Sequence, residues 1–109
     1  MWVRKATIRH LIHSGETERI VEGLIALSFL DNDWRWIQSL CLFFSKSEDE
    51  NVRGIAILCL GHLARIHRTI DIDIVKPVIL EALNDHSDFV RGHADSALID
   101  LETFCVQSE

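Results

Sequence analysis

The side chains that could carry chemistry in this chain do not form a metal-binding pattern. Two histidine pairs, His10 with His13 and His62 with His67, are the nearest approach to one. A zinc site needs three or four nitrogen, sulfur or oxygen ligands. No carboxylate or cysteine completes either pair at ligand spacing, so we expect no metal and no cofactor.

Nucleophilic catalysis also lacks a motif. The sequence has no Gly-x-Ser-x-Gly elbow, no cysteine beside a patterned histidine and no glycine-rich phosphate loop. The three cysteines, Cys41, Cys59 and Cys105, are odd in number, widely spaced and set in apolar surroundings. They are predicted to be buried thiols of a cytosolic protein. We therefore expect a protein that is not an enzyme and has no small-molecule substrate.

Two arginines occupy equivalent positions of an internal repeat. A shift of the sequence by 38 residues superposes Val52, Arg53, Gly54, Ala56 and Leu60 on Val90, Arg91, Gly92, Ala94 and Leu98. Five identities within nine positions indicate a true repeat. Each copy follows an acidic turn and a helix of similar length, so the repeated unit is a helical hairpin. We predict that both arginines pair within the chain, with acids of the turn that precedes each of them.

The elements that must position these residues are helices. Apolar side chains recur at spacings of three and four, which predicts an all-α fold of stacked helical hairpins in a single domain over residues 1–109. Six helices are expected, over about 4–13, 17–30, 34–44, 49–68, 71–83 and 88–104. The fourth should be the most buried. In the fifth, the residues expected to face the core are Ile74, Val75, Val78, Ile79, Ala82 and Leu83.

Two tryptophans begin the third predicted helix. Trp34 and Trp36 are two residues apart, which turns their side chains about 200° away from each other on a helix. One is expected to be buried and the other partly exposed beside Arg35, as an interface anchor, because Trp and Arg dominate binding hot spots. The alternative is that both are buried between neighbouring hairpins.

The repeat resembles the HEAT repeat, in which an apolar helix, an acidic turn and a Val-Arg pair follow one another. Pro77 and Asp85 match the proline and aspartate that this family places before the arginine, whereas Ser39 and Ser47 in the earlier copy do not. The resemblance covers about residues 33–101. It implies a HEAT-like α-solenoid with a right-handed superhelical stack.

Two stretches, NDWRWIQSLCL at 32–42 and CLGHLARIH at 59–67, resemble a narrower family of small bacterial HEAT-like proteins. Some members are immunity proteins encoded beside contact-dependent growth-inhibition toxins. This resemblance implies a toxin–antitoxin role, in which the chain covers the active site of a toxin domain.

The charge of the chain favours a basic protein partner. The formal net charge is −6 at pH 7, and it divides into +3 on residues 1–13 and −9 on residues 14–109. An acidic body repels nucleic acid phosphates and attracts basic proteins such as nucleases, which must grip phosphates themselves. We expect no direct contact with nucleic acid. A HEAT-repeat adaptor with a housekeeping partner is the alternative function, and a nucleic-acid binder using helix-end basic residues is a further rival.

The location of the protein is predicted from two further patterns. The longest runs without a charged residue, 36–45 and 54–64, are too short for a membrane span. Arg9 and His10 fall where the apolar core of a signal peptide would lie. We therefore expect a cytoplasmic protein.

The acidic turns are the predicted binding surface, because turns of one kind should form one ridge in a stack of hairpins. With the tryptophan–arginine anchor, the residues expected to bind the partner are Asp31, Asp33, Trp34, Arg35, Glu48, Asp49, Glu50, Asp71, Asp73, Asp85 and Asp88. A basic island lies at the end of the fourth helix and comprises His62, Arg65, His67 and Arg68. It either offsets the helix dipole or meets an acidic surface.

Overall fold

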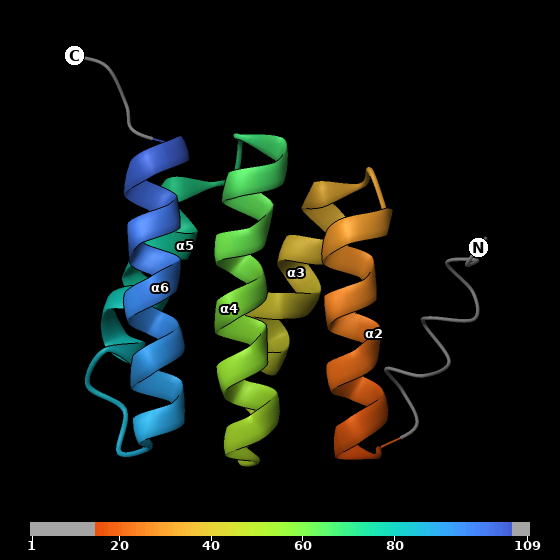
Figure 1. The fold of residues 1–109 in the computed structure, drawn as a ribbon, viewed down its shortest axis with the longest axis vertical. Coiled ribbons are helices and arrows are strands. Elements are labelled where there is room, and N and C mark those ends of the chain that lie inside the picture. The colour runs from red at the N-terminus through yellow and green to blue at the C-terminus, as the bar shows by residue number, and fades with distance from the viewer. Residues whose placement is uncertain (1–14, 106–109) are drawn as a thin grey trace.

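The computed structural model describes residues 15–105, and within this range the chain forms five α-helices and no strand (Figure 1). The helices are α2 (Thr17–Leu30), α3 (Trp34–Phe44), α4 (Glu50–His67), α5 (Ile72–Ala82) and α6 (Asp88–Phe104). The all-α prediction is confirmed, and these bounds agree with the predicted ranges to within one or two residues. The helix predicted over 4–13 lies outside the described residues. None of the described helices is long and apolar enough to cross a membrane.

Short polar side chains set where several helices begin. Asp33 accepts a hydrogen bond from the backbone N–H of Trp36, and Ser87 accepts one from Val90. Asp49 accepts from two backbone N–H groups of α4 in the same way. These side chains satisfy donors that the first turn of a helix otherwise leaves without a partner. At its other end α4 closes on Arg68, whose φ of 55° is left-handed.

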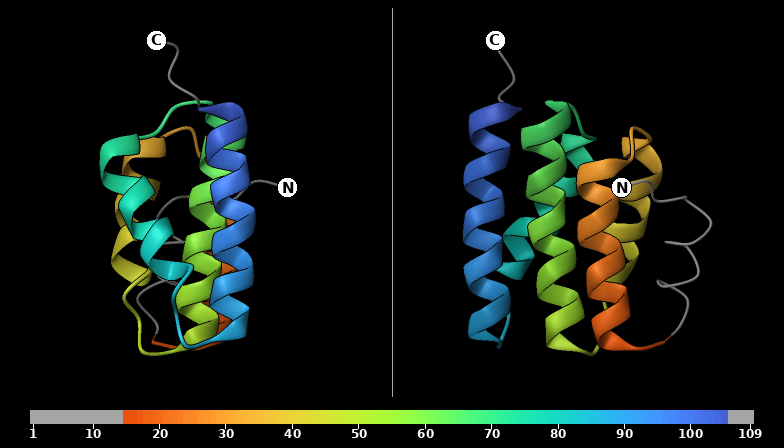
Figure 2. Two further views of the ribbon diagram at one scale, coloured as in Figure 1. Left: turned by 90° about the vertical axis from the view of Figure 1, so that its left-hand side faces the viewer. Right: turned by 45° about the vertical axis from the view of Figure 1, so that its right-hand side comes forward.

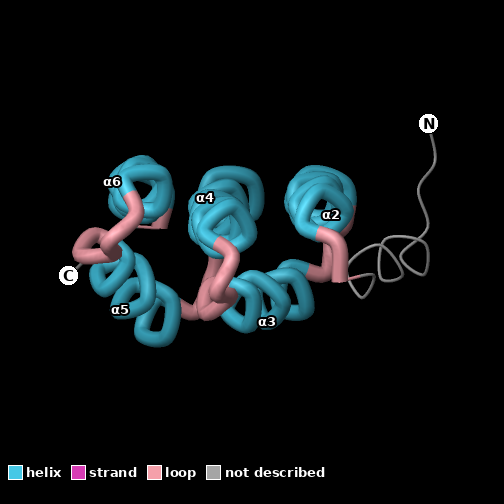
Figure 3. Tube along the Cα trace, turned by 90° about the horizontal axis from the view of Figure 1, so that it is seen from below, coloured by secondary structure: helices cyan, strands magenta, loops and turns pink. Residues whose placement is uncertain are grey.

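The helices form two layers (Figure 3). Helices α2, α4 and α6 run parallel in one layer, while α3 and α5 run the opposite way in the other (Figures 1 and 2). Each of α3–α4 and α5–α6 is therefore an antiparallel hairpin. Helix α4 lies at the centre, packed against α2, α3 and α6. It contributes more buried residues than any other described helix, as predicted.

Small residues allow α6 to approach α4 closely. A Cβ placed on Gly61 would lie only 2.9 Å from the Cα of Ala97. Gly54 lies beneath the ring of Phe89, where a Cβ would be 2.6 Å from the nearest ring atoms. Its equivalent in the second copy of the repeat, Gly92, has nothing within 4 Å of a Cβ. The two copies therefore share residues but differ in packing, because in the described residues no helix covers α6 in the way that α6 covers α4.

The expectation that Ile74 faces the core is wrong, because 55% of this residue is exposed. The buried face of α5 consists of Val75, Ile79 and Ala82. Ile74 lies 100° around the helix from Val75. Because α5 packs mainly against α6, only a narrow stripe of it is buried. The apolar face predicted from the sequence is wider than this stripe, so part of that face stays exposed.

Both tryptophans of α3 are partly buried and pack against the core. This agrees better with the alternative, in which both lie between neighbouring hairpins, than with one buried and one partly exposed ring. The guanidinium of Arg35 lies 4.7 Å from the ring centre of Trp34.

The three cysteines are buried free thiols, as predicted. Cys41 and Cys59 have no exposed surface, whereas Cys105, which follows the last residue of α6, is 8% exposed.

Candidate functional site

The predicted acidic residues lie at two opposite ends of the helix layers, so the expectation of a single ridge is wrong. The turns that hold Asp31, Asp33, Asp71 and Asp73 lie where α2 and α4 finish, at the top of Figure 1. The turns of Glu48–Glu50 and of Asp85 and Asp88 lie at the bottom, where α4 and α6 begin. In a chain of antiparallel helices successive turns alternate between the two ends, which the linear pattern of acids does not reveal.

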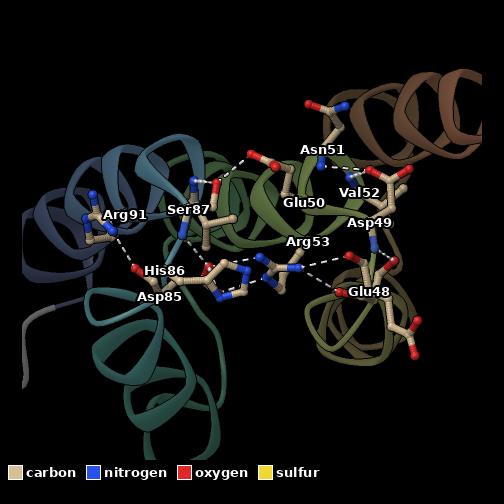
Figure 4. A network of polar contacts seen from close by, with 12 residues as sticks. Glu48, Asp49, Glu50, Asn51, Val52, Arg53, Asp85, His86, Ser87 and Arg91 are labelled. Atoms are coloured by element: carbon tan, nitrogen blue, oxygen red, sulfur yellow. Dashed lines mark hydrogen bonds and ion pairs between the residues drawn. The ribbon is translucent and has the colours of Figure 1, made fainter.

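Arg53 links the two hairpins at the lower end (Figure 4). Its Nε and Nη2 each donate to a carboxylate oxygen of Asp85, both over 2.8 Å. Its Nη1 donates to the backbone carbonyl oxygens of Ser47, at 3.0 Å, and Glu48, at 3.4 Å. The acid that pairs with Arg53 therefore belongs to the following hairpin, and the preceding turn contributes only carbonyl groups. For Arg53 the predicted pairing with an acid of the preceding turn is wrong.

Arg91, in the equivalent position of the second copy, behaves as predicted. It donates to the backbone carbonyl of Asp85 over 2.6 Å and forms an ion pair with Asp88. Both partners lie in or beside the turn that precedes it. Because the side chain of Asp88 is 93% exposed, this ion pair is well solvated and adds little stability.

Two further side chains tie α2 and α6 to the start of α4. The hydroxyl group of Thr17 donates to the carboxylate of Asp49, and that of Ser87 donates to Glu50 over 2.7 Å. Asp49 also accepts from the backbone N–H of Asn51 over 2.8 Å. The first turns of α2, α4 and α6 are thus joined by one polar network. We name this region the acidic end and define it by Glu18, Glu48, Asp49, Glu50, Asp85 and Asp88.

The network lowers the pKa of two of its carboxyl groups. The Arg53 guanidinium, together with the Ser87 N–H, lowers the pKa of Asp85 to about 2. The hydrogen bond from Thr17 lowers the pKa of Asp49, helped by the N–H groups of α4. Hydrogen bonds and positive charges favour the ionised form of a carboxyl group, which explains both directions. Both acids are therefore anionic at neutral pH.

These lowered pKa values predict acid destabilisation between about pH 4 and pH 2. An aspartate in an unfolded chain has a pKa of about 3.9, so stabilisation by ionised Asp85 is complete above that value and is lost as the pH falls toward its folded pKa. We expect the loss from Asp85 to be about 2 kcal/mol. Urea unfolding at a series of pH values checks this. Asp85→Asn should flatten the dependence, and an unchanged slope in that variant would contradict the assignment.

The arginine pairs leave an unequal charge at the acidic end. Arg53 offsets Asp85 and Arg91 offsets Asp88. Within the described part of the chain, no ion pair joins a basic side chain to Glu18, Glu48 or Glu50. The three are exposed. Negative charge is therefore concentrated around the first turns of α2 and α4.

At the opposite end the predicted residues mostly stabilise the fold. Gln38, only 4% exposed, donates from its side-chain amide to Asp71 over 2.8 Å and accepts from the backbone N–H of Asp71 over 2.9 Å. Asp31 accepts from the backbone N–H of Asp33. Gln38 was not among the predicted residues. Its position beside the apolar stripe of α3 could have indicated a buried polar residue that needs a hydrogen-bond partner. Of the four acids at this end, Asp33 and Asp73 are exposed.

The two histidine pairs seen in the sequence were expected not to bind a metal. His10 and His13 lie outside the described residues. Among residues 15–105, no three side chains of histidine, cysteine, aspartate or glutamate come together as metal ligands. The ring of His62 lies beside that of Phe29, with the two ring centres 4.9 Å apart.

One solved structure shares this fold over nearly the whole chain. It is a chain of the CDI complex from Cupriavidus taiwanensis LMG 19424, and the two superpose with a TM-score of 0.83 at 26% sequence identity. The match covers 95% of this chain and 90% of that one. No protein-family model matches, the HEAT-repeat family included, and no curated protein matches.

Proposed function

We propose that this chain is an immunity protein, which binds the toxin of a contact-dependent growth-inhibition system and blocks its active site. The observation that carries the proposal is the shared fold with a chain of a CDI complex over 95% of this sequence. The stretches at 32–42 and 59–67 also resemble immunity proteins of such systems. Together they support a role that needs a binding surface and no catalytic group.

The charge distribution supports a basic toxin domain, and we propose a nuclease. Exposed Glu18, Glu48 and Glu50 surround the first turns of α2 and α4. A nuclease needs a basic surface to hold phosphates, and an acidic surface on its inhibitor can occupy that site in place of the substrate. Long-range attraction of this kind speeds association and weakens as salt rises. We therefore place the principal electrostatic contact at the acidic end.

The other predicted binding residues form a secondary region in this proposal. Trp34 and Arg35 lie beside one another in the first turn of α3, at the opposite end of the layers from the acidic end. A single toxin domain can reach both ends only by lying along the helices, since the 18-residue helix α4 is about 27 Å long.

Co-expression with the product of the adjacent reading frame tests the function. We expect that product alone to stop growth, and we expect this chain to restore growth and to co-purify with it. Charge reversal by Glu18→Lys and Glu48→Lys should weaken the complex about 10-fold or more, mainly through the association rate. Asp95→Lys, an exposed site on α6 away from α4, is the matched control.

Two outcomes would contradict this function. The first is a neighbouring product that is harmless and forms no complex. The second is capture of a housekeeping assembly whose affinity does not change between low and high salt, which would favour the adaptor alternative.

A further inference from the structure

The α2–α4–α6 layer has an outer face, which we define as the side turned away from α3 and α5 (Figure 3). Helical spacing places Glu22 and Phe29 in one stripe of α2, seven residues apart. Leu58, His62 and Ile66 form the corresponding stripe of α4. On α6 it consists of Phe89, His93 and Asp100. The three helices lie parallel and side by side (Figure 1), and from their spacing we infer that these stripes are neighbours.

Aromatic contacts join the stripes into one band. The ring of Phe29 from α2 lies 4.9 Å from that of His62 on α4. On α6, the rings of Phe89 and His93 meet edge to face at 4.5 Å. Phe89 also covers Gly54 of α4. The pKa of His93 is lowered mainly by burial and also by the nearby His62. The two histidines, one on α4 and one on α6, are therefore neighbours. The band therefore crosses all three helices of the layer.

The band is open to a partner. Phe29 is 50% exposed, and Ile66 and Phe89 are each 38% exposed. Isolated apolar residues are common on protein surfaces, whereas contiguous apolar groups with a polar rim mark binding sites. The opposite layer differs. Helix α3 packs mainly on α4 and helix α5 mainly on α6, with few contacts between α3 and α5. The exposed side chains of Phe43 on α3 and Leu80 on α5 therefore belong to separate surfaces.

Carboxylates border this band on both sides. Glu22 is exposed on α2, in the stripe of Phe29, and Glu18 lies one turn before it at the acidic end. On α6, the carboxylate of Asp100 lies close to α4, 3.1 Å from where a Cβ of Gly61 would be. Exposed Arg65, seven residues after Leu58, adds one basic side chain to the α4 stripe. The acidic side chains on α2 and α6 are complementary to a surface whose apolar side chain is flanked by lysine or arginine.

We propose that the toxin docks on this outer face, with an apolar side chain beside Phe29 and His62 and basic side chains against Glu22 and Asp100. The inference rests on the proposed immunity function and extends it, because the acidic end alone would guide a basic partner without anchoring it. Binding hot spots are few and centrally placed, and aromatic residues are prominent among them. The rings of the band provide such an anchor.

The test compares exposed apolar residues of the two layers. Phe29→Ala and Ile66→Ser should each raise the Kd for the adjacent toxin about 10-fold or more, chiefly by faster dissociation. Phe43→Ala on α3 is the matched control, since Phe43 is 71% exposed and belongs to the other layer. It should leave the Kd unchanged. Circular dichroism and thermal unfolding of each variant show that the fold is retained.

The outcomes separate this inference from the proposed function. If the wild-type complex forms and Phe29→Ala and Ile66→Ser bind as tightly as wild type, the outer face is not the docking site and the immunity function stands. A loss confined to Phe43→Ala has the same meaning and points to the other layer. If the wild-type chain does not bind the toxin at all, both proposals are wrong.

Discussion

Arg53→Met is expected to destabilise the fold by about 3 kcal/mol, because it removes one member of an ion pair whose side chains are only 11% and 15% exposed. Methionine keeps much of the aliphatic length but leaves the carboxylate of Asp85 without its two guanidinium donors. It also leaves the carbonyl of Ser47 without the Arg53 donor. Charged groups that lose a partner in a partly buried place carry a large desolvation cost.

Arg91→Met is the matched control, since Arg91 has the same position in the repeat. Its carboxylate partner is solvated, so we expect a loss of about 1 kcal/mol or less. Urea denaturation of both variants gives the comparison. A double-mutant cycle of Arg53→Met with Asp85→Asn should show strong coupling. Equal losses at the two arginines would contradict the structural assignment, because only Arg53 joins one hairpin to the next.

Gly61→Val should cost about 3 kcal/mol, because it forces α6 away from α4. The backbone and side chain of Ala97 and the carboxylate of Asp100 surround the place where a Cβ would lie, at 2.9–3.2 Å. These atoms cannot all move without shifting α6. Gly61→Ala should also destabilise, although alanine is intrinsically better than glycine in a helix by about 1 kcal/mol.

Gly92→Ala, in the same layer, should stabilise the fold. Its Cβ would enter open space, so the variant should gain roughly 0.5–1 kcal/mol from helix propensity alone. Thermal unfolding should show a lower Tm for both Gly61 variants and a higher Tm for Gly92→Ala. A stable Gly61→Val protein would show that α4 and α6 are less closely packed than described.

Much of the fold was predictable from local patterns. Helices α2, α3, α4 and α6 begin near polar or acidic residues and carry apolar stripes at helical spacing, and the ranges predicted for them agree with the structure. The prediction for α5 was correct in extent and wrong at Ile74, since spacing identifies an apolar face but not how much of it a neighbouring helix covers.

The candidate site was less predictable. Acids near helix starts look alike in sequence, but Asp49 and Asp85 are held in hydrogen bonds while Glu18 and Glu48 face solvent. The spacing of the turns did not show that they alternate between two ends. The band of Phe29, His62 and Phe89 joins three helices separated by many residues, and no local pattern links them.

The amino-acid sequence by itself determined that the chain is helical and acidic and is built on a repeated hairpin, because propensity, charge and periodicity act over a few neighbouring residues. Only the tertiary structure decided which member of each repeated pair contacts the next hairpin. Arg53 and Gly54 lie in the centre of the stack and contact the next hairpin, while Arg91 and Gly92 occupy the same positions in α6, which no further described helix covers. Identical residues thus acquire different roles because contacts between distant segments, and not local sequence, determine their surroundings.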